Sequence, residues 1–216
     1  MSGERPGHRP PTFTPRSERE RLFVATAAVV ADLGLKNTTI AAVAHRAGCS
    51  VEDFTRYFAS VDDCVLAAFE SAADQAFTTA ADAALSTRGS WGEAIHAGLA
   101  ALLDFLAGAP EMTRMCTVDA LQAGAAALEL RDIVLDQFAE VLEPGYSARP
   151  NALPATVSEA VSGGLYELVR AHALENRLAE LPEALPEMTI IALAPFLGSE
   201  EAERLAVSPP PIRAVG

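Results

Sequence analysis

Residues 38–58, TTIAAVAHRAGCSVEDFTRYF, constrain the fold more than any other stretch of the chain. Four apolar residues in it follow the spacing i, i+3, i+4, i+7 and so share one face of a short helix: Ile40, Val43, Ala44 and Ala47. Gly48 follows this run, at the place where a helix commonly ends in a left-handed residue. Ser50 then begins a second helix, with Asp53 three residues later as in an acidic variant of the capping box. The pattern predicts a helix-turn-helix, whose second helix enters the major groove of DNA.

The composition favours packed helices over sheets. Half of the 216 residues are hydrophobic, whereas only 6% are aromatic. Alanine is abundant, and the strict alternation of β-branched residues that is typical of strands is absent. We therefore expect an all-α fold, long enough for one large domain or two small ones.

The hydropathy pattern predicts a cytoplasmic protein without a membrane partner. No apolar run reaches the roughly 18 residues that a membrane span needs. The first residues are polar and rich in proline, and they lack the apolar centre of a signal peptide.

The reactive side chains form no pattern typical of an enzyme or a metalloprotein. Cys49, Cys64 and Cys116 are far apart and form no CxxC pair, and the four histidines never cluster with them. The sequence contains no HExxH, no GxGxxG and no glycine-rich phosphate loop. We expect a protein that is not an enzyme and that uses no cofactor and no metal.

The net charge of −13 is unevenly distributed along the chain. Residues 1–58 hold eight Arg and Lys against six Asp and Glu, a net charge of +2. Residues 59–216 hold eight against twenty-three, a net charge of −15. The positive end coincides with the predicted helix-turn-helix, so the acidic remainder would orient the molecule on DNA by repulsion.

Prolines, glycines and capping residues divide the chain into parts. Residues 1–15 carry four prolines and no periodic pattern, and they form either a disordered tail or a flexible basic arm in which Arg5 and Arg9 touch DNA. Three parts follow: a head at 16–59, a helical body at 60–207 and a disordered tail at 208–216. We expect about nine helices in all, from periodicity and capping. Beyond the helix-turn-helix they cover residues 17–33, 60–85, 91–106, 111–117, 118–142, 153–176 and 185–197.

About a quarter of the chain, residues 17–70, resembles the DNA-binding domain of the tetracycline-repressor (TetR-type) family of bacterial transcription regulators. The matching residues have a fixed spacing: Ala31-Asp32-Leu33-Gly34, Thr38-Thr39-Ile40, Val43-Ala44, Ala47-Gly48-Cys49-Ser50, Phe54, Arg56-Tyr57-Phe58 and Ser60-Val61-Asp62-Asp63. The rest matches in layout only, because these regulators follow the head with a helical domain for ligand binding and dimerisation. The resemblance implies that residues 60–207 are that domain.

The resemblance also implies roles for single residues of the head. Thr38, Thr39 and Ser50 would meet DNA phosphates near helix N-termini, and Tyr57 would place its hydroxyl on the DNA backbone. Three further side chains would face base edges: Val51, Glu52 and Thr55. Arg56 completes the predicted DNA-binding set. Phe54 and Phe58 would be core residues that hold the second helix.

Three positions depart from the family pattern. Val61 stands where a lysine is usual, Asp53 where a threonine is common, and Thr55 where an aromatic residue is common. Glu52 would either accept a hydrogen bond from a cytosine amino group or point to solvent. We therefore expect this head to bind phosphates more weakly than is usual for the family.

The body supplies apolar and soft side chains on its middle helices, as either plain core or the lining of a ligand pocket. By resemblance the pocket lies among the helices from about 91 to 142, with a small, largely apolar effector. Its predicted residues are Phe105, Met112, Met115, Cys116, Asp119, Gln122, Phe138 and Tyr166.

The two segments 153–176 and 185–197 are the expected homodimer interface. One side of the first presents Val157, Ala160, Val161, Gly164, Leu165 and Leu168. The pair Gly163-Gly164 costs a helix about 1 kcal/mol per glycine relative to alanine, which indicates either a close approach by another helix or a local kink. Two such helices from each subunit would form a symmetric contact that matches a palindromic operator.

Together these features predict a homodimeric DNA-binding regulator, a repressor by family habit, that a small ligand releases from its operator. The alternative is a protein of the same fold whose acidic head no longer reads DNA and which serves as a ligand- or protein-binding module.

Overall fold

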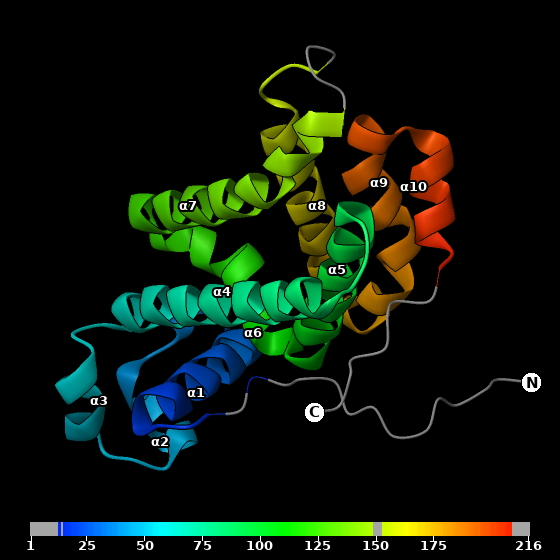
Figure 1. Cartoon of the computed structure of the whole chain (residues 1–216). Helices are drawn as coiled ribbons and strands as arrows, with labels where there is room; N and C mark the ends of the chain where they lie inside the picture. The colour runs from blue at the N-terminus through cyan, green and yellow to red at the C-terminus, as the bar shows by residue number, and fades with distance from the viewer. Residues whose placement is uncertain (1–12, 14, 149–152, 209–216) are drawn as a thin grey trace, which may run out of the picture.

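The computed structural model describes residues 13, 15–148 and 153–208 (Figure 1). All regular structure in these residues is helical, with ten α-helices and several short 3-10 or π turns. The prediction of an all-α fold is confirmed.

The head consists of three helices whose ends are set by local capping. They are α1 (Glu18–Leu33), α2 (Ile40–Ala47) and α3 (Val51–Tyr57). The Thr39 and Ser50 hydroxyl oxygens accept the backbone N–H groups of Ala42 and Asp53, at 3.2 and 3.1 Å, and so begin α2 and α3. Gly48 ends α2 with φ 71° and ψ 34°, a left-handed conformation that glycine adopts without strain. The predicted helix-turn-helix is therefore confirmed.

Seven further helices form the body. They are α4 (Val61–Ser86), α5 (Trp91–Gly108), α6 (Pro110–Arg114), α7 (Ala125–Leu142), α8 (Val157–Leu174), α9 (Leu185–Leu197) and α10 (Ser199–Ala206). The long helix α4 begins beside the head and runs into the body, where it lies between the head and α7 (Figure 1). Helices α9 and α10 lie side by side on the far side of the body from the head (Figure 1).

The body contains two local features that periodicity does not reveal. The segment expected to be one helix over 118–142 is instead broken by a π turn, η2 (Met115–Asp119), a 3-10 turn, η3 (Ala120–Ala123), and Gly124 at φ 103°. The tenth helix, α10, follows α9 directly across Gly198 at φ 88°. Both breaks occur at glycines in conformations that L-residues rarely adopt.

The buried side chains form three hydrophobic cores. The largest joins α1, α3 and α4 to the α6–η2 segment, and it includes Phe23, Phe54, Phe69, Met112 and Cys116. A second centres on Phe196 of α9 with the Trp91 and Tyr146 rings against it, at centroid distances of 5.6 and 5.4 Å. The third surrounds Leu103 and Leu181. The head and the body therefore share one core.

Ordered packing extends slightly beyond the predicted boundaries at both ends. Phe13, within the predicted arm, is buried in the largest core. Near the other end, the Nε2–H of His96 donates to the Ser208 carbonyl (3.2 Å) and its Nδ1 accepts from the Thr189 hydroxyl (2.8 Å). Burial lowers the pKa of His96, which favours the neutral ring that this pairing needs. Apart from the exposed Pro15, the rest of both predicted tails lies outside the described residues.

Gly145 offers a test of this packing. A Cβ at Gly145 would lie 2.5 Å from Trp91 Cη2 and 2.7 Å from Phe196 Cδ1, and neither ring can move without disturbing the second core. We expect Gly145→Ala to destabilise the protein by about 1–3 kcal/mol, as overpacking does. Gly163→Ala is the matched control, because a Cβ there meets nothing within 4 Å and alanine favours a helix by up to about 1 kcal/mol. Urea unfolding followed by circular dichroism measures both, and equal midpoints would contradict the packing described.

Candidate nucleic-acid interface and ligand cavity

Helix α3 presents one polar face to solvent and buries the other. The Phe54 side chain is fully buried and Phe58 nearly so, and their rings lie 5.7 Å apart. The five residues of α3 in the predicted DNA-binding set are all exposed: Val51, Glu52, Thr55, Arg56 and Tyr57. The head thus has the shape that a major-groove reader needs, with a short exposed helix fixed from behind by aromatic packing.

A carboxylate of the chain itself occupies the N-terminus of α3. Asp53 Oδ2 accepts the Ser50 backbone N–H at 3.1 Å and the Ser50 hydroxyl at 2.8 Å, which completes the capping box. These hydrogen bonds from Ser50 lower the pKa of Asp53, so the group is anionic at neutral pH. A DNA phosphate near Ser50 would meet this negative charge.

Other acids pair with the polar groups that DNA would otherwise contact. Arg56 lies 3.0 Å from Asp53, and Arg46 pairs with Asp32. The Tyr57 hydroxyl donates to Glu18 Oε2 at 3.2 Å. Asp32 and Glu18 are exposed and Asp53 is partly exposed, and ion pairs in contact with solvent are weak, so a phosphate oxygen can replace each carboxylate.

Of the other residues predicted to contact DNA, two form hydrogen bonds within the protein and two lie outside the described residues. Thr39 caps α2, and the Thr38 hydroxyl donates to the Gly34 carbonyl at 3.0 Å. Arg5 and Arg9 lie outside the described residues, so their contact with DNA stays a prediction.

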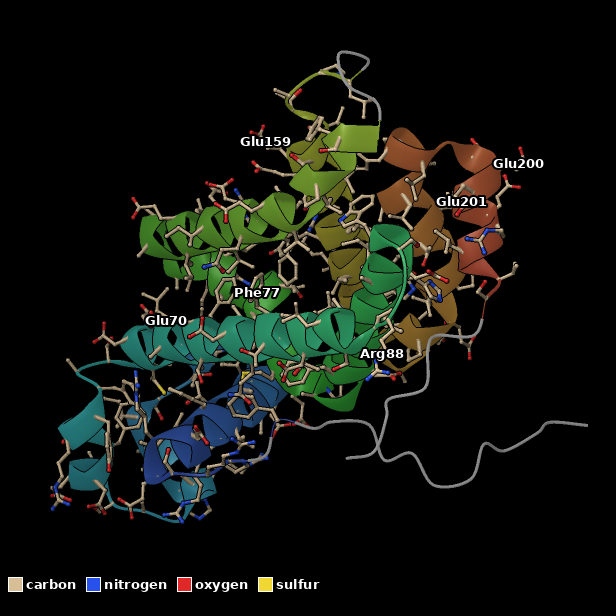
Figure 2. The ribbon with its side chains drawn as sticks, in the orientation of Figure 1. Glu70, Phe77, Arg88, Glu159, Glu200 and Glu201 are labelled. Carbon is tan, nitrogen blue, oxygen red and sulfur yellow. The ribbon has the colours of Figure 1, made fainter. Side chains whose placement is uncertain are left out.

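The body contains an apolar cavity of about 370 Å³. It is lined by α4, α5, α7 and α8, with contributions from the α6–η2 segment and α9. Five of the eight predicted pocket residues line it: Phe105, Met112, Cys116, Phe138 and Tyr166. The rings of Phe77 on α4 and Phe138 on α7 meet edge to face across it, 5.7 Å apart. Figure 2 shows Phe77 between these two helices.

Three predicted pocket residues do not line the cavity. Met115 is fully buried in the core shared with the head. The Asp119 carboxylate lies 3.8 Å from Arg114 Nε, and Gln122 is exposed. The prediction assumed regular helix here, whereas the π turn adds a residue to the turn and rotates the side chains that follow.

On α4 the residues that line the cavity are mostly alanines, which were not among the predicted pocket residues. On α4 the lining consists of Phe69, Ala72, Ala73, Ala76, Phe77, Ala80, Ala81, Ala84 and Leu85. The methyl side chains from Ala72 to Ala84, over about three turns of the helix, leave space that larger residues would fill. The sequence does contain a signal for this cavity wall, namely the repetition of alanine at helical spacing on one face of a long helix.

The polar groups of the cavity wall are already used within the protein. The hydroxyls of Thr113, Thr117 and Ser162 donate to the carbonyls of neighbouring backbone at 2.7 to 2.9 Å. The Tyr166 hydroxyl donates to the Thr117 carbonyl at 3.2 Å, and burial raises the pKa of Tyr166 to about 12. No charged side chain is among the lining residues that the structure describes.

Most residues predicted for a dimer interface face the chain's own core instead. Val161 is 7% exposed and belongs to the second core, against which Val157 also packs. Leu165 lines the cavity, and Leu168 packs against the third core. Helix α8 uses its apolar side to cover these features, and only Ala160 and Gly164 of the predicted set are exposed.

The described residues include neither a cluster of metal ligands nor a single membrane-spanning helix. Within the described part of the chain, no three His, Cys, Asp or Glu side chains gather as a metal site would require. No single helix of that part is long and apolar enough to cross a membrane, although Trp91–Gly108 and Pro110–Ala123, bent by 101°, reach that criterion as a pair.

Solved structures share this architecture. FadR, a fatty acid degradation regulator from Bacillus halodurans, superposes with a TM-score of 0.74 over 83% of this chain and 96% of its own, at 14% identity. A TetR-family transcription regulator from Marinobacter aquaeolei VT8 gives 0.58 over 78% and 93%, at 21% identity. The chain has the TetR fold.

Another solved structure of this fold contains a ligand. The transcriptional regulator FadR from Bacillus subtilis, in complex with stearoyl-CoA, gives a TM-score of 0.69 over 82% of this chain and 97% of its own, at 14% identity. No protein-family model and no curated protein matches this sequence. At these identities the structures establish the fold, and function has to be argued from the site.

Thiol reactivity tests the burial of the cavity wall. Burial raises the pKa of Cys116 to about 12 and that of Cys64 to about 11, whereas Cys49 is partly exposed. We therefore expect an aromatic disulfide reagent at mildly alkaline pH to modify only Cys49 rapidly, because the thiolate is the reacting form. Spectrophotometric titration should count all three thiols after denaturation, and Cys49→Ser should remove the fast phase. Three fast thiols in the native protein would contradict the burial.

Proposed function

We propose that this protein is a DNA-binding transcriptional regulator, acting as a repressor, that a small and largely apolar effector releases from DNA. One observation carries the proposal: the core that holds the reading helix α3 continues into the wall of the ligand cavity. Phe54, on the buried side of α3, belongs to the same core as Phe69, Met112 and Cys116, which line the cavity. An effector in the cavity is therefore in mechanical contact with the head.

Two elements would transmit the effect of the ligand. Helix α4 lines the cavity from Phe69 to Leu85 and begins directly after the head. The α6–η2 segment packs against α1 and places Met112 and Thr113 in the cavity wall. A ligand that binds the non-DNA arrangement of these elements more tightly would shift the population away from DNA.

A homodimer in the cytoplasm would supply the second reading head for a palindromic operator. Because α8 turns its apolar side inward, the proposed contact uses the small residues Ala160 and Gly164 on its exposed side. Close approach of two helices at such residues is sterically open, since a Cβ at Gly164 meets nothing within 4 Å.

A gel-shift experiment tests the proposal directly. The probe is the DNA upstream of the protein's own gene, in a series of salt concentrations and with competitor DNA. We expect sequence preference that survives the competitor and an affinity that falls as salt rises. Absence of binding to any promoter fragment would instead support a ligand- or protein-binding module with a degenerate head.

The acidic capping box gives a sharper prediction. Asp53→Ala should lower the thermal midpoint because α3 loses its cap partner, yet it should strengthen DNA binding because Arg56 and the helix N-terminus become free. The slope of log affinity against log salt should steepen by about one. Stability comes from calorimetry and affinity from fluorescence anisotropy.

Glu52→Ala is the control for Asp53→Ala. It removes a neighbouring negative charge from the same helix but leaves the cap intact, so binding should strengthen without loss of stability. Weaker DNA binding by Asp53→Ala at a temperature where it is folded would contradict the placement of α3 against DNA.

The dimer contact is tested at Gly164. A leucine there has open space within the single chain, so Gly164→Leu should fold with unchanged helicity, but it should weaken the dimer by obstructing close helix approach. Light scattering over a dilution series measures the mass, and circular dichroism verifies the fold. A mass equal to that of the parent protein at every concentration would refute this contact.

A further inference from the structure

The cavity has an elongated shape. Its lining on α4 extends from Phe69 to Leu85, sixteen residue steps of 1.5 Å, or about 24 Å along the helix axis. Its lining on α5 extends from Ala94 to Leu106 and continues to Ala109. An extended hydrocarbon chain fits such a space better than a compact ring system does.

The interior offers no partner to a charged head group. The lining residues that the structure describes include no charged side chain, and their four hydroxyls donate to backbone carbonyls. Because an unpaired charge in an apolar interior is costly, any ionised group of a ligand has to stay at the mouth.

Exposed apolar lining residues mark the mouth between α4 and α7. Leu85 is 85% exposed and Val141 is 38% exposed, although both line the cavity. Phe77 precedes Leu85 by about two turns of α4 and lies between the two helices (Figure 2).

The two helices at the mouth are acidic. Helix α4 has no Lys or Arg, and it carries Asp62, Asp63, Glu70, Asp74 and Asp82. Asp74 and Asp82 are exposed and stand three residues before Phe77 and Leu85, so each is a surface neighbour of a lining residue. Nothing on α4 would therefore balance a phosphate at the mouth.

Among the residues that the structure describes, the cations near the mouth do not compensate. Arg131 is the one basic residue of α7, and its Nε and Nη2 donate to Asp132 at 3.0 and 2.6 Å. Arg88 lies beyond the end of α4, on the side turned away from α7 (Figure 2). Like charges so close to the entrance repel an anion, most strongly at low ionic strength.

We infer that the cavity takes an extended lipophile without an anionic head group, and that it rejects acyl-CoA thioesters. This inference rests on the proposed function, in which the cavity is the effector site. It separates this protein from the Bacillus subtilis regulator of the same fold, whose structure contains stearoyl-CoA.

The test compares two ligands with the same hydrocarbon chain. Phenylnaphthylamine, an uncharged fluorescent lipophile, is the probe for the full-length protein, and decanol or decanoyl-CoA is added at low salt as the competitor. We expect decanol to displace the probe, and decanoyl-CoA to bind about tenfold more weakly or worse because of charge repulsion.

Charge reversal isolates the cause. The double variant Asp74→Arg, Asp82→Arg places cations beside the mouth and should bring decanoyl-CoA close to the affinity of decanol. The matched control is Glu200→Arg, Glu203→Arg, which makes the same change of charge with three-residue spacing on α10, away from the cavity lining. The control should leave the preference for decanol intact.

The outcomes separate the inference from the proposed function. If decanoyl-CoA binds the parent protein as tightly as decanol, or if both double variants have the same effect, the inference is overturned while the cavity stands as a ligand site. If neither the probe nor any of the ligands binds, the effector site itself is refuted, and the inference with it.

Discussion

The packing of the α6–η2 segment against α1 is the contact on which the rest of the structure depends. Met112 and Cys116 belong at once to the core behind the reading helix and to the wall of the cavity. If these two regions had separate cores, a ligand bound in the body could affect the head only through α4. The π turn at Met115–Asp119 lies within this contact, and π turns are frequent at functional sites.

Local sequence signals predicted the head well because its structure is determined locally. Ser50 and Asp53 are three residues apart and bond to each other, and Gly48 needs only its own φ angle to end α2. The body was predicted less well because its features depend on distant contacts. The break that begins at the π turn Met115–Asp119, and with it the positions of Met115 and Gln122, follows from packing among α1, α4 and α8 that no short pattern encodes.

The residues predicted for the dimer interface show the same dependence on distant contacts. Val161 and Leu165 have the helical spacing of an interface, but that spacing gives only the apolar side of a helix and not the partner that covers it. In this chain the partner of α8 is the chain's own interior. The alanines of α4 show a related limit. Their pattern predicts a helix, but it does not reveal that they line an empty volume in the folded chain.

The alanine face of α4 also has an evolutionary consequence. Its methyl groups are arranged along the cavity at successive turns, each about 5.4 Å from the next. Replacing one of them by a larger residue would close the cavity at that depth and leave the outer part open. If the cavity is the effector site that we propose, single substitutions far from the head would set the length of the molecule that fits, without a change in the residues of α3.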